Sequence, residues 1–229
     1  MKNLIAIALA PIFLSLSPDK LKTIEYYKVN LNKEKIEFVW KNKKNKIFSS
    51  IGNVLKKDSS YTMVMNGGMY TTTQNPLGLY IENGKTHRKL NSVKKAYGNF
   101  YMQPNGIFYI QKDSAKVTQT VDFKLDSTIT FATQSGPMLL INGEFHPKFM
   151  KGSKNLNIRN GVGILPDGNP IFAISTVPIN LYDFASFFKE NGCKNALYLD
   201  GAISRAYIPS KGLQDKGGKF GVMITVKPN

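Results

Sequence analysis

A set of Asn-Gly and Asp-Gly pairs restricts the fold of this chain more than any other feature. Such pairs supply the positive φ angles that two-residue β-hairpin loops need, and each pair separates two short apolar or alternating runs. The pairs are Asn83-Gly84, Asn105-Gly106, Asn142-Gly143 and Asp167-Gly168, and the strands expected around them span residues 79–82, 98–103, 107–112, 117–123, 138–141, 161–165 and 170–175. The pattern predicts a largely antiparallel sheet.

The remaining periodic segments complete the predicted fold. Residues 21–40 alternate between apolar and charged side chains, 51–57 suit a short helix, and 220–226 suit a final strand. Residues 180–191 form the clearest helix, with Asn180 as N-cap and Gly192 as C-terminal stop. This helix joins strand 170–175 to the apolar run 196–199, which favours a right-handed crossover between parallel strands. We therefore expect an α+β fold: one domain with a strand-rich, largely antiparallel sheet body, a few helices and one parallel crossover near the C-terminus.

The N-terminal segment, residues 1–17, has the features of a secretory signal peptide. Lys2 is followed by an uncharged apolar run over 4–14 and by the small-x-small sequence Ser15-Leu16-Ser17. The apolar run is shorter than a membrane span requires, and an apolar first strand or an uncleaved anchor is the alternative. We expect a mature domain of residues 18–229 with no transmembrane span, exported to the periplasm or the cell exterior.

The formal net charge of +16 comes almost entirely from lysine, because the chain has only three arginines. Specific nucleic-acid recognition usually relies on arginine forks and interleaved aromatic residues, which the lysine clusters lack. The charge instead predicts a solvated surface that favours anionic envelope polymers. Cys193 is the sole cysteine, which excludes an intrachain disulfide, and two histidines are too few for a histidine-based zinc site.

Residues 195–209 place an acid, a hydroxyl and a guanidinium close together after a buried run. The strand-like segment 196–199 stops at Asp200-Gly201, and Ser204 and Arg205 follow. A carboxylate at the end of a buried strand is costly unless it is paired or functional. The alternative is that Asp200 caps a turn, as Asp-Gly pairs often do.

Three other segments supply candidate partners for Asp200. Asn66-Gly67-Gly68 ends a buried run, and a polar loop follows it rather than a returning strand. Ser135-Gly136 forms a second glycine-marked bend with a free hydroxyl. Arg159 stands in a lysine-rich chain, which suggests a bidentate anionic acceptor, although a structural salt bridge fits equally well. His146 has the chemistry of an acid or base, but its place beside Pro147 is also typical of a loop residue.

Taken together, these bends resemble the phosphodiester glycosidases. The matching segments are MNGGMY (65–70), QSGPMLLINGE (134–144), RNGVGILPDGNPIFAIS (159–175) and NALYLDGAISRAYI (195–208), in the family's order. The family's last motif usually reads Leu-Asp-Gly-Gly, one residue and then Ser. Here Ala202 and Ile203 separate Gly201 from Ser204, so the second glycine is lost while the aspartate remains.

This resemblance implies an exported hydrolase that cleaves the glycosidic bond of a sugar-1-phosphodiester or a related envelope glycoconjugate. It makes Asp200 the catalytic carboxylate and Arg159 the phosphate clamp, with Asp183 preferred to Glu144 as a second carboxylate. The expected substrate-binding residues are Asn66, Gly67, Gly68, Ser135, Gly136, Ser204 and His146. The spacing requires no cofactor or metal, although oxygen ligands around Asp200 would suit calcium or magnesium. The alternative is a non-catalytic saccharide- or phosphate-binding envelope protein.

Overall fold

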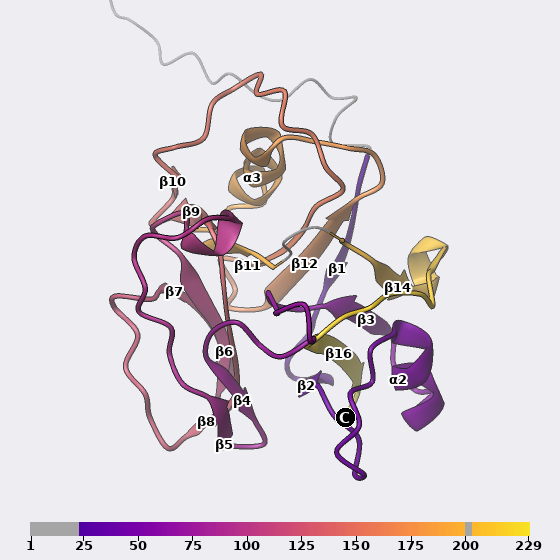
Figure 1. The fold of residues 1–229 in the computed structure, drawn as a ribbon. Helices are drawn as coiled ribbons and strands as arrows, with labels where there is room; N and C mark the ends of the chain where they lie inside the picture. Colours follow the sequence, from indigo (N-terminus) through magenta and orange to yellow (C-terminus); the bar gives the residue numbers. More distant parts are fainter. Residues whose placement is uncertain (1–22, 200–202) are drawn as a thin grey trace, which may run out of the picture.

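The computed structural model describes residues 23–199 and 203–229, and it arranges them as three antiparallel sheets with a shared core (Figure 1). The predicted signal peptide, the start of the predicted mature domain and Asp200 lie outside the described residues. In every strand pair of the described part the two strands run antiparallel.

The first sheet has six strands in the order β1-β12-β11-β13-β9-β10. Their bounds are β1 (Ile24–Lys28), β12 (Pro170–Ser175), β11 (Asn160–Ile164), β13 (Ala196–Tyr198), β9 (Met138–Ile141) and β10 (Glu144–Phe145). The inner strands β11 and β12 are buried along nearly their whole length, so they read as apolar or small residues.

The other two sheets have five strands each. The β3–β16 sheet has the order β15-β14-β3-β16-β2, from β15 (Leu213–Gln214), β14 (Ala206–Ile208), β3 (Met63–Asn66), β16 (Met223–Pro228) and β2 (Glu34–Val39). The β6–β8 sheet has the order β5-β4-β8-β6-β7, from β5 (Lys85–Arg88), β4 (Tyr80–Glu82), β8 (Ile129–Ser135), β6 (Gly106–Gln111) and β7 (Ser114–Gln119).

One apolar cluster joins the three sheets. Phe172 of β12, Ile224 of β16 and Phe108 of β6 all belong to it and are fully buried. Helix α3 (Leu181–Glu190) covers the opposite face of the six-stranded sheet, and α2 (Ile51–Lys57) covers the outer face of the β3–β16 sheet (Figure 1). Short 3₁₀ turns occur at η1 (Asn99–Tyr101) and η2 (Pro209–Lys211).

Much of the predicted element list is confirmed. The hairpins at Asn83-Gly84, Asn142-Gly143 and Asp167-Gly168 join β4 to β5, β9 to β10 and β11 to β12. Asn180 caps α3 by accepting a hydrogen bond from the Asp183 amide, and Ser50 caps α2 in the same way.

Three expectations are wrong. Strands β12 and β13 do not form a parallel pair, because β11 lies between them and is antiparallel to both. The strand expected over 98–103 is absent, because residues Asn99–Tyr101 form a 3₁₀ turn. Asn105-Gly106 therefore makes no hairpin: Gly106 begins β6, and the Asn105 side chain donates to the Phe100 carbonyl instead.

No helix in the described ranges, 23–199 and 203–229, has the length and apolar character to cross a membrane.

Candidate active site

The predicted motifs lie at one end of the strands of the six-stranded sheet. At this end β13 stops, and β11 and β9 begin, because both neighbours are antiparallel to β13. The Leu199 amide donates to the Asn160 carbonyl at 3.1 Å, and the Gly68 amide donates to the Leu199 carbonyl at 3.0 Å. The Asn66-Gly67-Gly68 bend is thereby fixed against the end of β13.

Three polar side chains form what we call the amide cluster: Asn66, Asn160 and Ser204. Asn160 Nδ2 donates to the Asn66 carbonyl at 2.8 Å and to Asn66 Oδ1 at 3.1 Å. Asn66 Oδ1 also accepts from the Arg205 amide at 2.9 Å. Ser204 Oγ donates to the Ile158 carbonyl at 3.1 Å and lies 3.5 Å from Asn160 Oδ1. The cluster therefore joins β3, β11 and the segment that leads into β14.

One hydrogen-bond donor of the amide cluster is not used by the described residues. Asn66 is fully buried, yet its Nδ2 has no hydrogen-bond partner among the described residues. A buried amide donor without a partner is costly, so it is a natural ligand-binding or site-ordering group.

The two glycines after Asn66 are required by close packing. A side chain at Gly67 would collide with Ile224, and one at Gly68, whose φ is +133°, would collide with Thr133 Oγ1. Ser135 lies two residues beyond Thr133 on β8, so it faces the same side of its sheet as Thr133. Its Oγ is buried and has no partner among the described residues. Gly136 allows close approach of a different kind, because a Cβ there would lie 2.6 Å from Asn105 Cβ.

Arg159 does not join the amide cluster. It precedes Asn160 in the chain, and consecutive strand residues point to opposite faces. Its guanidinium lies on the α3 side, where Nε donates to the Ile179 carbonyl, Nη1 to the Tyr198 hydroxyl and Nη2 to Asn155. The ring of Tyr198, at the end of β13, lies 5.5 Å from Arg159 Cζ.

Arg159 has no carboxylate partner among the described residues, although only 1% of it is exposed. A structural salt bridge with a described residue is therefore not the reason for this arginine. The side chain lines a small cavity of about 110 Å³, which we call the arginine cavity. Lys148 and Ser153 line the same cavity, so its polar groups suit a small anion.

His146 lies near the arginine cavity and is buried. Its ring stacks on Phe149, a cavity residue, at 4.8 Å between centroids, and its Nδ1 accepts from the Lys148 amide. Burial lowers the pKa of His146 to about 4, against the opposing effect of the Gln103 and Met102 carbonyls. The imidazole is therefore neutral at pH 7, and its Nε2 makes no hydrogen bond of good geometry within the described ranges, the Gln103 and Met102 carbonyls included.

The two candidates for a second carboxylate differ sharply in position. Asp183 is buried in the first turn of α3, on the Arg159 side of the sheet, and its Oδ2 accepts from Asn180 Nδ2 at 3.0 Å. Glu144 is exposed on the edge strand β10 and pairs with Lys189 at 3.5 Å. The buried Asp183 therefore lies on the same side of the sheet as Arg159, whereas Glu144 lies at an exposed sheet edge.

Asn160 and Tyr198 are the polar residues that sequence reasoning missed. Both fall inside quoted motifs, RNG (159–161) and ALYLDG (196–201), so the signal was present. Asn160 adjoins an arginine whose charge is the stronger signal. Tyr198 falls in an apolar run that predicts a buried strand, yet its hydroxyl accepts from Arg159.

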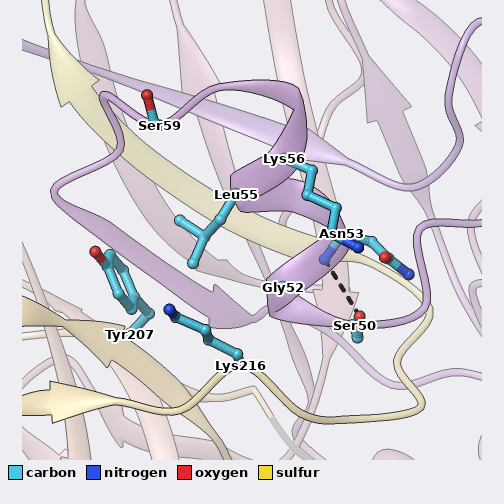
Figure 2. Close-up of a pocket in the computed structure, with 8 residues that line it drawn as sticks. All are labelled: Ser50, Gly52, Asn53, Leu55, Lys56, Ser59, Tyr207 and Lys216. Carbon is cyan, nitrogen blue, oxygen red and sulfur yellow. Dashed lines mark hydrogen bonds between the residues drawn. The ribbon is translucent and has the colours of Figure 1, made fainter.

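The described part of the chain offers no group of three or more His, Cys, Asp or Glu side chains that could hold a metal ion. A larger hollow of about 560 Å³ lies between α2 and β14, and none of the predicted site residues lines it (Figure 2).

Residues 59–222 match the phosphodiester glycosidase family. The chain is also 35% identical over 232 residues to the uncharacterized protein YigE of Escherichia coli (strain K12), covering 97% of this chain and 91% of that protein.

Two solved structures share the fold. The catalytic domain of zebrafish N-acetylglucosamine-1-phosphodiester alpha-N-acetylglucosaminidase, auto-inhibited by its pro-peptide, aligns with a TM-score of 0.58 at 15% identity, over 90% of this chain and 84% of that one. A Burkholderia pseudomallei protein, whose name marks it as a candidate for export, aligns with a TM-score of 0.63 at 9% identity, over 90% and 74%.

Proposed function

Because the chain belongs to the phosphodiester glycosidase family, we propose that it hydrolyses the glycosidic bond of a sugar-1-phosphodiester or a related envelope glycoconjugate. We further propose that residues 1–17 direct its export, so that residues 18–229 act in the periplasm or outside the cell. The zebrafish relative's substrate class and the signal-like N-terminal sequence support these two statements.

Asp200 is the proposed catalytic carboxylate. The observation that supports this role is the buried Nδ2 of Asn66, which has no hydrogen-bond partner among the described residues. Both flanks of residues 200–202 are bonded to the Asn66-Gly67-Gly68 bend. On one flank the Leu199 carbonyl accepts from Gly68, and on the other the Arg205 amide donates to Asn66 Oδ1. A carboxylate held beside such donors suits attack at, or charge stabilisation of, an anomeric carbon.

Arg159 and Asp183 complete the proposed machinery from the α3 side of the sheet. A buried guanidinium without a carboxylate partner among the described residues is costly, and a phosphate would compensate its charge. Nη1 has two hydrogens and makes one hydrogen bond with the described residues, so its second hydrogen is the donor proposed for the phosphate. Asp183 is the proposed second carboxylate. Gly67, Gly68, Ser135, Gly136 and Ser204 are the proposed sugar-binding residues, and His146 is the proposed binding residue beside the arginine cavity.

Turnover of sugar-1-phosphodiesters by the purified mature protein, with and without a chelator, tests the proposal. Asp200→Asn should lower kcat by about 10³-fold and leave the thermal transition in place. Glu144→Gln is the matched control, because it removes an exposed carboxylate and should keep the wild-type rate. An Asp200→Asn protein with wild-type turnover would remove the assignment. A sugar phosphodiester that binds and stays intact would instead support a non-catalytic binding protein.

A further inference from the structure

The hollow between α2 and β14 has the composition of a binding site for an anionic saccharide. Its volume is about 560 Å³. Figure 2 shows Leu55, Tyr207 and Lys216 turned toward one another across it, with Lys56 on the same helix as Leu55. An aromatic ring beside an aliphatic side chain offers a face on which a sugar can pack.

The charge of this hollow is positive and uncompensated. No acidic residue lines it, and among the described residues neither Lys56 nor Lys216 forms an ion pair. The acidic residues nearest to these lysines in the chain are engaged elsewhere: Asp58 pairs with Lys227 at 2.9 Å, and Asp215 pairs with Arg205 at 2.6 Å. The Ser50 hydroxyl caps α2, so the lysines and not the helix start supply the site.

The hollow is connected to the amide cluster through a short, well-bonded segment. Arg205 binds Asn66 Oδ1 through its amide and Asp215 through its side chain. Tyr207 follows two residues later on β14, and the Lys216 carbonyl accepts from the Gly52 amide of α2 at 2.9 Å. Tyr207 pairs with Val64, two residues before Asn66 on β3, so a ligand that extends from the amide cluster along β14 would run toward Tyr207 and the hollow.

We propose that this hollow is a secondary subsite that binds the next phosphate and sugar of a substrate with several phosphodiester-linked units. The inference rests on the proposed function, and it makes the natural substrate a polymer rather than a single sugar phosphodiester. Lys56 and Lys216 bind the phosphate, while the Tyr207 ring and Leu55 pack against the sugar.

The test compares two synthetic compounds that share the same cleavable sugar-1-phosphodiester, one with a single phosphate and one extended by a second phosphodiester-linked sugar. The double variant K56Q/K216Q should lower the ratio of kcat/KM for the extended compound over the short one by about fivefold, because two exposed charge contacts are lost. The matched control K85Q/K89Q removes two exposed lysines at the β5 edge of another sheet and should leave the ratio unchanged.

Calorimetric titration with both compounds separates this subsite from the activity. If the wild type binds the extended compound more tightly without cleaving it, and K56Q/K216Q loses that gain, the subsite stands and the hydrolase proposal falls. If the wild type cleaves both compounds and K56Q/K216Q leaves the ratio unchanged, the subsite falls and the hydrolase stands. Binding of neither compound overturns both.

Discussion

At the scale of single residues, Arg159 is the side chain whose observed contacts bear most directly on the proposed chemistry. Four of its hydrogen bonds go to neutral oxygens, so its charge is solvated but not neutralised by the described residues. A guanidinium fork fits these acceptors and a phosphate at once, which an ammonium group cannot do. This makes the arginine a test of whether the arginine cavity receives the phosphate.

Arg159→Lys should raise KM for sugar phosphodiesters about tenfold, because an ammonium group cannot keep the bonds to Ile179, Tyr198 and Asn155 and also donate to the phosphate. KM for an uncharged aryl glycoside of the same sugar should change much less, and steady-state kinetics on the two substrates measures both. The uncharged substrate controls for general damage to the site. An equal rise in KM for both substrates would remove the phosphate role and leave Arg159 a structural residue that holds Tyr198.

His146 predicts how stability depends on pH. Its pKa is about 4 in the folded protein and about 6.5 in an unfolded chain, because burial disfavours the charged imidazolium. The unfolded state therefore binds more protons between these values, so the free energy of unfolding falls as the pH drops below about 6.5. Between pH 7 and pH 5 the wild type should lose on the order of 1 kcal/mol more than His146→Asn.

Urea unfolding of both proteins at the two pH values checks this. His87 remains in each protein, so its own titration cancels in the comparison. An identical pH dependence for the two proteins would show that His146 titrates normally and is not buried as described.

At the scale of elements, the closeness of α3 to the six-stranded sheet depends on a glycine. A Cβ at Gly163 of β11 would lie 2.6 Å from Phe188 Cδ1 and 2.8 Å from Cys193 Sγ. Gly163→Ala should therefore destabilise the protein by about 2 kcal/mol through overpacking, as measured by urea unfolding.

A second substitution distinguishes overpacking from a backbone effect. Phe188→Leu makes room on α3, so Gly163→Ala and Phe188→Leu combined should cost less than the sum of the two single variants. Strict additivity would mean that the helix does not press on Gly163.

Local sequence patterns predicted most elements, and their failures have physical causes. Asn83-Gly84 forms a hairpin because both residues adopt the positive φ angles of a two-residue turn, and a side chain at Gly84 would meet open space. Asn105-Gly106 carries the same local signal, yet a Cβ at Gly106 would lie 2.7 Å from the Thr118 carbonyl. Tertiary packing thus decides the use of this second pair. The prediction of a parallel crossover fails for a similar reason. The sequence of α3 and its two flanking strands contains no sign that β11 lies between β12 and β13.

At the scale of the whole molecule, the site is assembled from segments that lie far apart in the chain. Asn66 and Asn160 are 94 positions apart, and Asn66 and Arg205 are 139 apart. Each segment has its own glycines and polar residues, so the segments of the candidate site could be predicted one by one from the sequence. The placement of Arg159 and Asn160 on opposite faces depends on the strand's orientation in the sheet, which no local pattern reports.

A common core for three sheets predicts that they unfold as one cooperative unit. Two unique probes report on different layers: Trp40, the only tryptophan, lies in the shared core and packs edge-on to Tyr80 of β4, whereas Cys193, the only cysteine, lies in the cluster between the six-stranded sheet and α3. Burial raises the pKa of Cys193 to about 12, so its thiol should resist alkylation at pH 8 until the chain unfolds.

Tryptophan fluorescence and pulsed alkylation of Cys193 should therefore give the same urea midpoint. Phenylalanines from β6, β12 and β2 meet in one cluster, so no sheet can detach without disrupting the packing of the other two. Iodoacetamide labelling at each urea concentration, read by mass spectrometry, supplies the second curve. The fully unfolded protein in concentrated urea sets the rate of the unprotected thiol. A Cys193 midpoint clearly below that of Trp40 would mean that α3 and the six-stranded sheet detach first, and that the amide cluster is lost before the rest of the fold.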